Sequence, residues 1–70
     1  MKIEFSLDTD DATIREALLA NFHKTTPLYV TCREDEREYR VLQVGIHHVW
    51  LRTLNGRRAF PLSCVARIWA

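Results

Sequence analysis

The chain opens with an alternation of apolar and polar residues. Ile3, Phe5 and Leu7 fall on one side of an extended segment and polar residues fall on the other, which predicts a half-buried strand. The same alternation returns at residues 28–32 and again at residues 47–54. These three segments are therefore expected to be strands with one face on a core.

Between the first two of these strands the apolar residues take the spacing of a helix. Ile14, Leu18 and Phe22 recur every four residues, so that one helical face covers a core. We predict a helix within residues 12–24. Pro27 is expected to end it, because the residue before a proline is pushed out of the helical region.

Short polar residues precede this helix and can accept hydrogen bonds from its first free amides. Two positions suit this role. Asp10 is one, and Thr13 is the other, since it has capping-box spacing to Glu16. The helix is therefore expected to begin at either residue.

The alternation slips once in the second half of the chain. In residues 39–44 the apolar positions include both Val41 and Leu42, which are neighbours. A β-bulge or a sharp bend produces such a slip. Gly45 permits a second bend immediately afterwards.

A hairpin follows. Asn55-Gly56 is a strong signal for a tight turn, because both central positions of a type I′ turn need positive φ. Residues 57–62 are expected to pair back on the preceding strand, and a last short strand is expected at residues 66–69. Residues 33–38 are charged and predict a second, solvated hairpin tip.

These elements make one helix and a series of short, bent, sequential strands. As a flat sheet they would leave open edges, and closing into a small barrel removes that problem. We therefore predict a single mainly β domain over residues 1–70. It has an extra strand within residues 1–8, a helix within 12–24 and a five-stranded, strongly bent antiparallel barrel over 28–70.

Composition adds bounds to this fold. The chain has 70 residues, of which 47% are hydrophobic and 27% charged, as in a folded domain. No apolar run reaches the roughly 20 residues that span a membrane, and residues 1–5 lack the apolar stretch of a signal peptide. A cytoplasmic protein is expected. A chain this short buries only about 60% of its unfolded surface, so a homo-oligomer formed through the strand edges at 57–62 or 66–69 is also expected.

The charge is divided unevenly along the chain. Residues 1–38 hold all nine carboxylates and five basic residues, a balance of −4, whereas residues 39–70 hold five arginines and no carboxylate. An arginine-only segment favours a partner that carries phosphate. The alternative is that these arginines pair with the acids of the first half across the fold. Both interpretations stay open at this point.

Aromatic residues interleaved with arginines form the one constellation that predicts a function. Single-stranded nucleic acid is bound by aromatic faces that stack on bases and by arginines along the backbone. Phe60 and Trp50 are expected to be mainly structural. The predicted nucleic-acid-binding residues are Arg40, Arg52, Arg57, Arg58, Tyr29 and Tyr39, with Arg52, Arg57 and Arg58 grouped around the hairpin turn.

No pattern of catalytic, metal-binding or cofactor-binding residues is present in the sequence. His47 and His48 are adjacent on a predicted strand and so point to opposite faces, which does not suit a shared metal ion. Ser63 lacks the context of a nucleophile. Cys32 and Cys64 lie far apart in apolar stretches and are expected to be buried free thiols.

Residues 14–70 resemble the bacterial Sm-like domain of the RNA chaperone Hfq in the order of their elements: a helix, a connector with proline, then five strands. The segment 62–68, Leu-Ser-Cys-Val-Ala-Arg-Ile, is similar in pattern to the one that joins the last two strands of Sm-like proteins. The resemblance implies an Sm-like or SH3-like barrel that binds RNA and forms rings. The Lys-His pair of the Hfq uridine site would fall near Leu62-Ser63, which cannot supply those contacts.

A second resemblance involves the same barrel. Residues 40–45, the tripeptide Val49-Trp50-Leu51 and residues 58–62 look like the WYL domain of bacterial transcription regulators, although its central tyrosine is missing here. This resemblance implies a regulatory module that senses a ligand or contacts a protein without binding nucleic acid directly. It is the alternative to the RNA-binding or single-strand-binding function.

Overall fold

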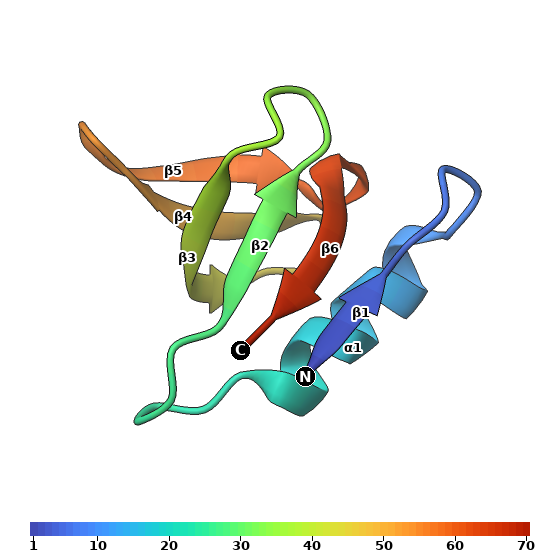
Figure 1. The fold of residues 1–70 in the computed structure, drawn as a ribbon, viewed down its shortest axis with the longest axis horizontal. Helices are drawn as coiled ribbons and strands as arrows, with labels where there is room; N and C mark the ends of the chain where they lie inside the picture. Colours follow the sequence, from blue (N-terminus) through green and yellow to red (C-terminus); the bar gives the residue numbers. More distant parts are fainter.

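In the computed structural model, which describes residues 1–70, one helix packs beside a sheet of six antiparallel strands (Figure 1). The strands are β1 (Lys2–Glu4), β2 (Tyr29–Cys32), β3 (Glu38–Val44), β4 (His48–Thr53), β5 (Gly56–Pro61) and β6 (Val65–Trp69). The helix α1 (Asp11–Asn21) lies between β1 and β2 in the chain, and the short 3-10 helix η1 (Leu62–Cys64) lies between β5 and β6. The predicted mainly β fold with one helix and an extra N-terminal strand is confirmed.

The strands follow the order β1-β6-β2-β3-β4-β5. β1 and β5 are the two edges and do not pair with each other, so the sheet is open. It bends strongly, and the hairpin of β4 and β5 reaches the end of the molecule opposite α1 (Figure 1). Within β3 the register shifts between Val41, opposite Leu51, and Gln43, opposite Trp50. This irregularity confirms the bulge predicted from the slip in alternation.

The core lies between the inner face of the bent sheet and the helix. Ile14 and Leu18 of α1 are at most 2% exposed and belong to one cluster of 13 buried residues with the inner side chains of the strands. η1 adds Leu62, and α1 packs against it. The predicted apolar face of the helix is thus confirmed.

The helix begins where one of the two alternatives placed it. The Asp10 carboxylate accepts a hydrogen bond from the Thr13 amide at 2.8 Å, so Asp10 is the N-cap. The predicted end is wrong, because α1 stops at Asn21, well before Pro27. Phe22 takes an extended backbone conformation and packs against the core, and this packing draws the chain out of the helix early. No helix of the structure combines the length and the apolar character needed to cross a membrane.

The hairpin between β4 and β5 is confirmed, but its turn differs from the predicted one. Thr53 pairs with Gly56, so the turn residues are Leu54 and Asn55, and of these four residues Gly56 alone has positive φ, at 111°. The Thr53 hydroxyl donates to the Gly56 carbonyl at 3.1 Å and accepts from the Asn55 amide at 3.3 Å. These bonds fix the turn one residue earlier than a type I′ turn at Asn55-Gly56.

One of the two edges proposed for self-association is covered. β1 pairs with β6 of the same chain, with Ile3 opposite Ile68, and β2 pairs with the other side of β6. The expectation that residues 66–69 form an open edge is therefore wrong. β5 pairs only with β4 and remains an edge.

The cysteines also depart from expectation. Cys32 and Cys64 are joined by a disulfide, with their Cα atoms 5.5 Å apart, so that no free cysteine remains. β2 pairs with β6, and η1 ends where β6 begins, so the sheet itself brings these two residues together. The Arg33 amide donates to the Cys64 carbonyl at 2.7 Å beside them.

Candidate nucleic-acid interface

The arginines of the second half of the chain make no ion pair with a carboxylate. The only ion pair in the structure joins Lys2 Nζ and Glu4 Oε1 at 3.4 Å. The interpretation that these arginines neutralise the acids of the first half is therefore wrong. Their guanidinium groups are left for other contacts.

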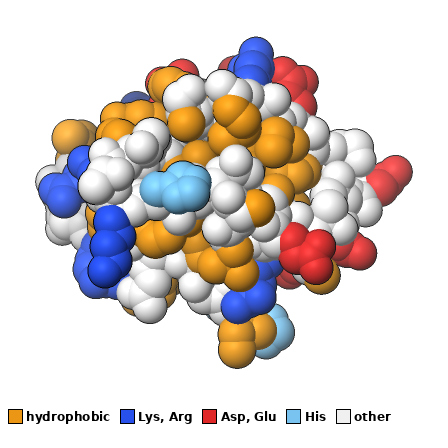
Figure 2. Space-filling view, turned by 90° about the horizontal axis from the view of Figure 1, so that it is seen from below, with side chains coloured by type: hydrophobic (Ala, Val, Ile, Leu, Met, Phe, Trp, Pro, Cys, Tyr) orange, Lys and Arg blue, Asp and Glu red, His pale blue; other side chains and the backbone are white.

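These arginines are divided among three surfaces. Arg52 and Arg57 are register partners on the outer face of β4 and β5, whereas Arg58 lies on the opposite face of the same hairpin. Arg40 lies on β3 directly before Val41, which pairs with Leu51, and is therefore next to the position of Arg52; Arg67 lies on β6. On the side of the molecule shown in Figure 2, the end that holds the hairpin carries Lys and Arg without Asp or Glu, whereas further toward the end that holds the loop before α1 Lys and Arg lie beside Asp and Glu.

The outer face of the hairpin carries a guanidinium stacked on an indole. The Arg57 guanidinium lies 4.7 Å from the centre of the Trp50 ring, and Arg57 Nη2 donates to Gln43 Oε1 at 2.9 Å. Because Gln43 pairs with Trp50 across β3 and β4, these three side chains form one surface with Arg52. We call this set, Gln43, Trp50, Arg52 and Arg57, the outer surface.

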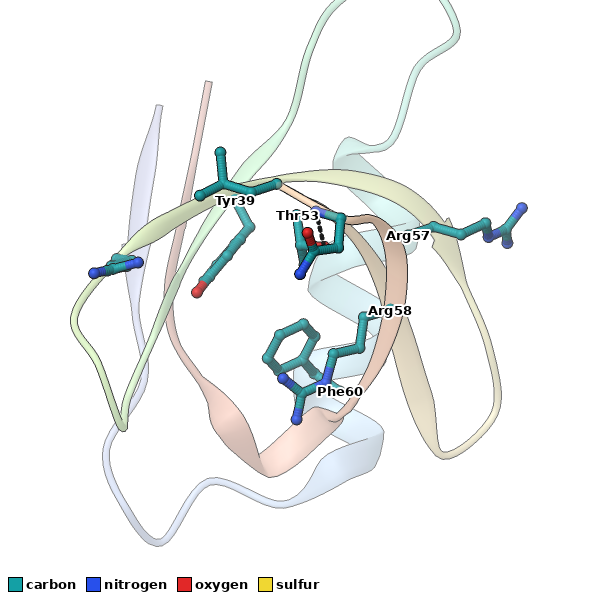
Figure 3. A pocket seen from close by; sticks show the side chains of 8 residues that line it. Tyr39, Thr53, Arg57, Arg58 and Phe60 are labelled. Atoms are coloured by element: carbon teal, nitrogen blue, oxygen red, sulfur yellow. Dashed lines mark hydrogen bonds between the residues drawn. The ribbon is translucent and has the colours of Figure 1, made fainter.

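On the other side of the hairpin lies a hollow of about 330 Å³, which we call the hairpin pocket. The residues that line it come from β3 with the turn before it, from the end of β4 with the hairpin turn, and from β5: Arg37, Tyr39, Thr53, Leu54, Asn55, Arg57, Arg58 and Phe60. Figure 3 shows Tyr39, Arg58 and Phe60 directed into this hollow and Arg57 directed away from it.

Aromatic rings and a guanidinium form the inner wall of the hairpin pocket. The Tyr39 and Phe60 rings are 5.4 Å apart between centres and tilted by 38°. The Arg58 guanidinium lies 4.9 Å from the centre of the Phe60 ring. Phe60 is only 8% exposed, so it acts mainly as a backing for Arg58, in agreement with its predicted structural role.

Tyr39, one of the predicted nucleic-acid-binding residues, is turned toward the core. It lies on the same side of β3 as Val41 and packs against the buried cluster. Its hydroxyl donates to Asp35 Oδ2 at 2.6 Å. This bond, with a second one from the Arg37 amide, lowers the pKa of Asp35, and the same hydroxyl–carboxylate bond raises the pKa of Tyr39.

Tyr29 is far from the hairpin in the sheet. It lies on the outer face of β2, opposite Arg40, and its ring stacks on Trp69 with the centres 4.8 Å apart and an angle of 24°. The structure therefore brings Arg58 together with Tyr39, and Arg40 together with Tyr29, as two separate groups.

Several residues that line the hairpin pocket were not predicted from the sequence, and Arg37 and Asn55 are the two that the pocket's chemistry uses most. Arg37 belongs to a turn that is mostly acidic, and Asn55 was considered only as a turn residue. No local pattern identifies either of them, because the pocket forms only when the start of β3 lies beside the hairpin turn. No group of three or more His, Cys, Asp and Glu side chains is placed to hold a metal ion.

A larger hollow of about 530 Å³ lies between α1 and the loop after β3. Asp11 and Glu16 line it, together with Arg15, whose Nε donates to the Gly45 carbonyl at 3.0 Å. Two carboxylates make it unfavourable for an anion.

Comparisons of the chain with known protein families, with curated proteins and with solved structures find no match. The function must therefore be argued from the residues themselves.

Proposed function

We propose that this protein is a non-catalytic, regulatory module of the cytoplasm that binds RNA or single-stranded DNA. One observation carries the proposal: the five arginines of residues 39–70 have no carboxylate partner, and two of them, Arg57 and Arg58, lie over aromatic rings on either side of one hairpin. Guanidinium groups held in this way can contact phosphates while neighbouring rings stack on bases.

The finer fold that we propose is an Sm-like or SH3-like barrel. It is supported by the strong bend of the sheet at the β3 bulge and by the tight 3-10 turn that leads into the last strand. The helix that precedes the five later strands has the place expected from the resemblance to Hfq. A small barrel of this kind presents loops and hairpin ends at its rim, where Arg57 and Arg58 lie.

The proposal has a defined salt dependence. Contacts of Arg52, Arg57 and Arg58 with three phosphates would make log K fall with log salt concentration at a slope of about −2, since each contact on a single strand contributes about −0.7. Stacking on the aromatic side chains adds about 1–3 kcal/mol per base and depends little on salt.

Fluorescence polarisation with labelled A-rich and U-rich oligonucleotides, at low and physiological salt, tests this function. We expect binding at low salt, with the slope given above. The double variant Arg57→Ala with Arg58→Ala should lose at least tenfold in affinity and show a smaller slope. Lys24→Ala with Arg67→Ala removes the same charge away from the hairpin and should have a much smaller effect. Absence of binding to both oligonucleotides, or an unchanged slope in the hairpin variant, rejects the proposal.

The rival function is a regulatory module that contacts a protein or senses a ligand without binding nucleic acid, as the resemblance to WYL domains implies. The division of the arginines among three surfaces favours it, because a nucleic-acid track is commonly one continuous basic face. Failure of both oligonucleotides to bind would leave this function in place of the first.

The proposal includes self-association, but with fewer strand edges available for it than the sequence predicted. Since β6 has a partner on both sides, a homo-oligomer joined through strand edges would have to use β5 or the three-residue β1. β5 is the longer edge, at six residues.

A further inference from the structure

The hairpin pocket offers two kinds of surface to one small ligand. Tyr39 and the guanidinium of Arg58 are planar groups that point into the same hollow (Figure 3). Arg37 adds a second guanidinium to the lining, and both arginines are exposed and free of ion pairs. The aromatic part suits a flat ring, and the charged part suits an anion.

The size of the hollow limits the ligand. At about 330 Å³ it falls at the lower end of the range of about 300–1,000 Å³ that is usual for small-molecule sites. This space admits one nucleotide rather than a run of stacked bases. Phosphate is the anion that two guanidinium groups contact most effectively, because their planar N–H groups can bind it in pairs.

We propose that the hairpin pocket binds a single nucleoside monophosphate unit, with its base between Tyr39 and Arg58 and its phosphate contacted by Arg37 and Arg58. This inference rests on the proposed function and gives that function a defined subsite. The unit is either a free mononucleotide or one nucleotide of a bound strand. Phe60 supports Arg58 from behind, and the Asn55 side chain, which also lines the pocket, is a polar group that can meet a base edge.

The charges around the pocket favour this ligand. Asp35 is tied to the pocket through its hydrogen bond from the Tyr39 hydroxyl but does not line it, whereas the guanidinium groups of Arg37 and Arg58 do. The pocket is therefore still net positive. The bond to Asp35 also holds the Tyr39 ring, so the surface on which a base would stack is present before the ligand arrives.

The outer surface differs in a way that supplies a control. There, Arg57 already donates to Gln43 and lies over Trp50, so this guanidinium and this ring face each other rather than an open hollow. The outer surface can contact the phosphates of a strand but does not enclose a base. Mononucleotide binding should depend on the hairpin pocket alone, whereas strand binding should depend on both.

Titration of the 15N-labelled protein with mononucleotides, followed by NMR, tests the inference. AMP and UMP are expected to shift the amide signals of Tyr39, Thr53 and Gly56 in a saturable way. Adenosine and uridine, which lack the phosphate, should bind at least tenfold more weakly. Inorganic phosphate, which lacks the base, should also bind at least tenfold more weakly.

Four variants locate the site. Arg37→Gln with Arg58→Gln should weaken AMP binding at least tenfold, and Arg37→Gln alone, in an exposed turn, should weaken it measurably without endangering the fold. Arg52→Gln, on the outer surface and outside the pocket lining, is the control for Arg37→Gln and should change AMP affinity by less than about threefold, through the general field only. Asp35→Asn removes a negative charge near the pocket and should strengthen AMP binding by about twofold at low salt.

The outcomes separate this inference from the proposed function. Oligonucleotide binding without mononucleotide shifts at the hairpin pocket overturns the subsite and leaves the proposed function intact. Equal affinity for AMP and inorganic phosphate overturns the role of the base and reduces the site to an anion site. Loss of AMP binding in the outer-surface variant but not in the pocket variant overturns the location. Binding of neither AMP nor any oligonucleotide overturns both proposals.

Discussion

At the scale of single residues, Tyr39 links the core to the hairpin pocket. Its ring packs against buried side chains, while its hydroxyl donates to the exposed carboxylate of Asp35 in the preceding turn. The bond stabilises the ionised form of Asp35, so the pKa of that carboxyl lies below its ordinary value of 3.8. One side chain thus fixes both the turn between β2 and β3 and one wall of the pocket.

We expect the substitution Tyr39→Phe to raise the pKa of Asp35 toward 3.8, because the largest cause of its lowering is the Tyr39 hydroxyl. An NMR titration of the side-chain carboxyl carbons measures this pKa directly. Asp10 is the control, since its own pKa is lowered by hydrogen bonds from Thr13 and should not change. An Asp35 pKa that is the same in the variant and the wild type would show that the bond is not formed in solution.

The same bond gives the stability of the protein a pH dependence with a definite sign. The folded-state pKa of Asp35 is lowered. The contribution of Asp35 to stability is therefore present above the unfolded-state pKa and disappears as the pH falls through the folded-state pKa. The folded-state pKa of Tyr39 is raised above its ordinary value of 10.0. The contribution of Tyr39 to stability is therefore present below the unfolded-state pKa and disappears as the pH rises through the folded-state pKa.

The orientation of Tyr39 shows where sequence reasoning fails at this scale. The slip at Val41 and Leu42 predicted the bulge correctly, but it left open which side of β3 faces the core before the slip. The structure places Tyr39 and Val41 on the inner side and, beyond the bulge, Gln43 on the outer side. A bulge moves every later residue of the strand to the opposite face. An error of one residue in the position of the bulge therefore places side chains on the wrong face of the sheet.

At the scale of elements, the disulfide joins β2 to η1 and closes a loop with a sequence separation of 32 residues. Closing a loop of this length restricts the unfolded chain, which stabilises the folded state by about 2–4 kcal/mol. In a reducing compartment the two sulfurs would be thiols, and this contribution would be missing.

We expect the oxidised protein to unfold at a higher urea concentration than the reduced one, with a difference of about 2–4 kcal/mol in the free energy of unfolding. Urea denaturation with and without dithiothreitol measures it, after mass spectrometry has shown which form is present. The double variant Cys32→Ala with Cys64→Ala should be insensitive to dithiothreitol. Equal stability of the two wild-type forms would contradict the prediction.

Elements were predicted best where local pattern determines them. The helix start at Asp10, the bulge in β3 and the hairpin of β4 and β5 all follow from residues close together in the sequence. The helix end, the β1–β6 pairing and the Cys32–Cys64 contact depend instead on which distant segments meet. The hairpin pocket belongs to this second group, because Arg37 and Asn55 meet only through the order of β3, β4 and β5.

At the scale of the whole molecule, the two edges of the sheet differ in how open they are. β1 is only three residues long, whereas β5 presents six residues that include Arg57, Arg58 and Pro61. Charged residues and proline on an edge strand oppose pairing with another chain. Two copies joined through β5 would bring their arginines close together, so the edge is open but repels its own copy at low salt.

This repulsion gives self-association a salt dependence opposite to that of nucleic-acid binding. Because salt screens the repulsion between arginines on two β5 edges, we expect the homo-oligomer to strengthen as the salt concentration rises from about 50 to 500 mM, where the Debye length falls from roughly 14 to 4 Å. Light scattering coupled to size-exclusion chromatography, over a range of micromolar concentrations, measures the mass at each salt concentration. Arg57→Gln with Arg58→Gln should associate already at low salt, because it removes the repelling charges, whereas Arg40→Gln with Arg67→Gln, away from this edge, should behave like the wild type. A monomeric mass at every salt concentration, in both the wild type and the β5 variant, would remove self-association from the proposal. An oligomer that dissociates when salt is added would contradict association through β5, because it would be held together by ionic contacts elsewhere.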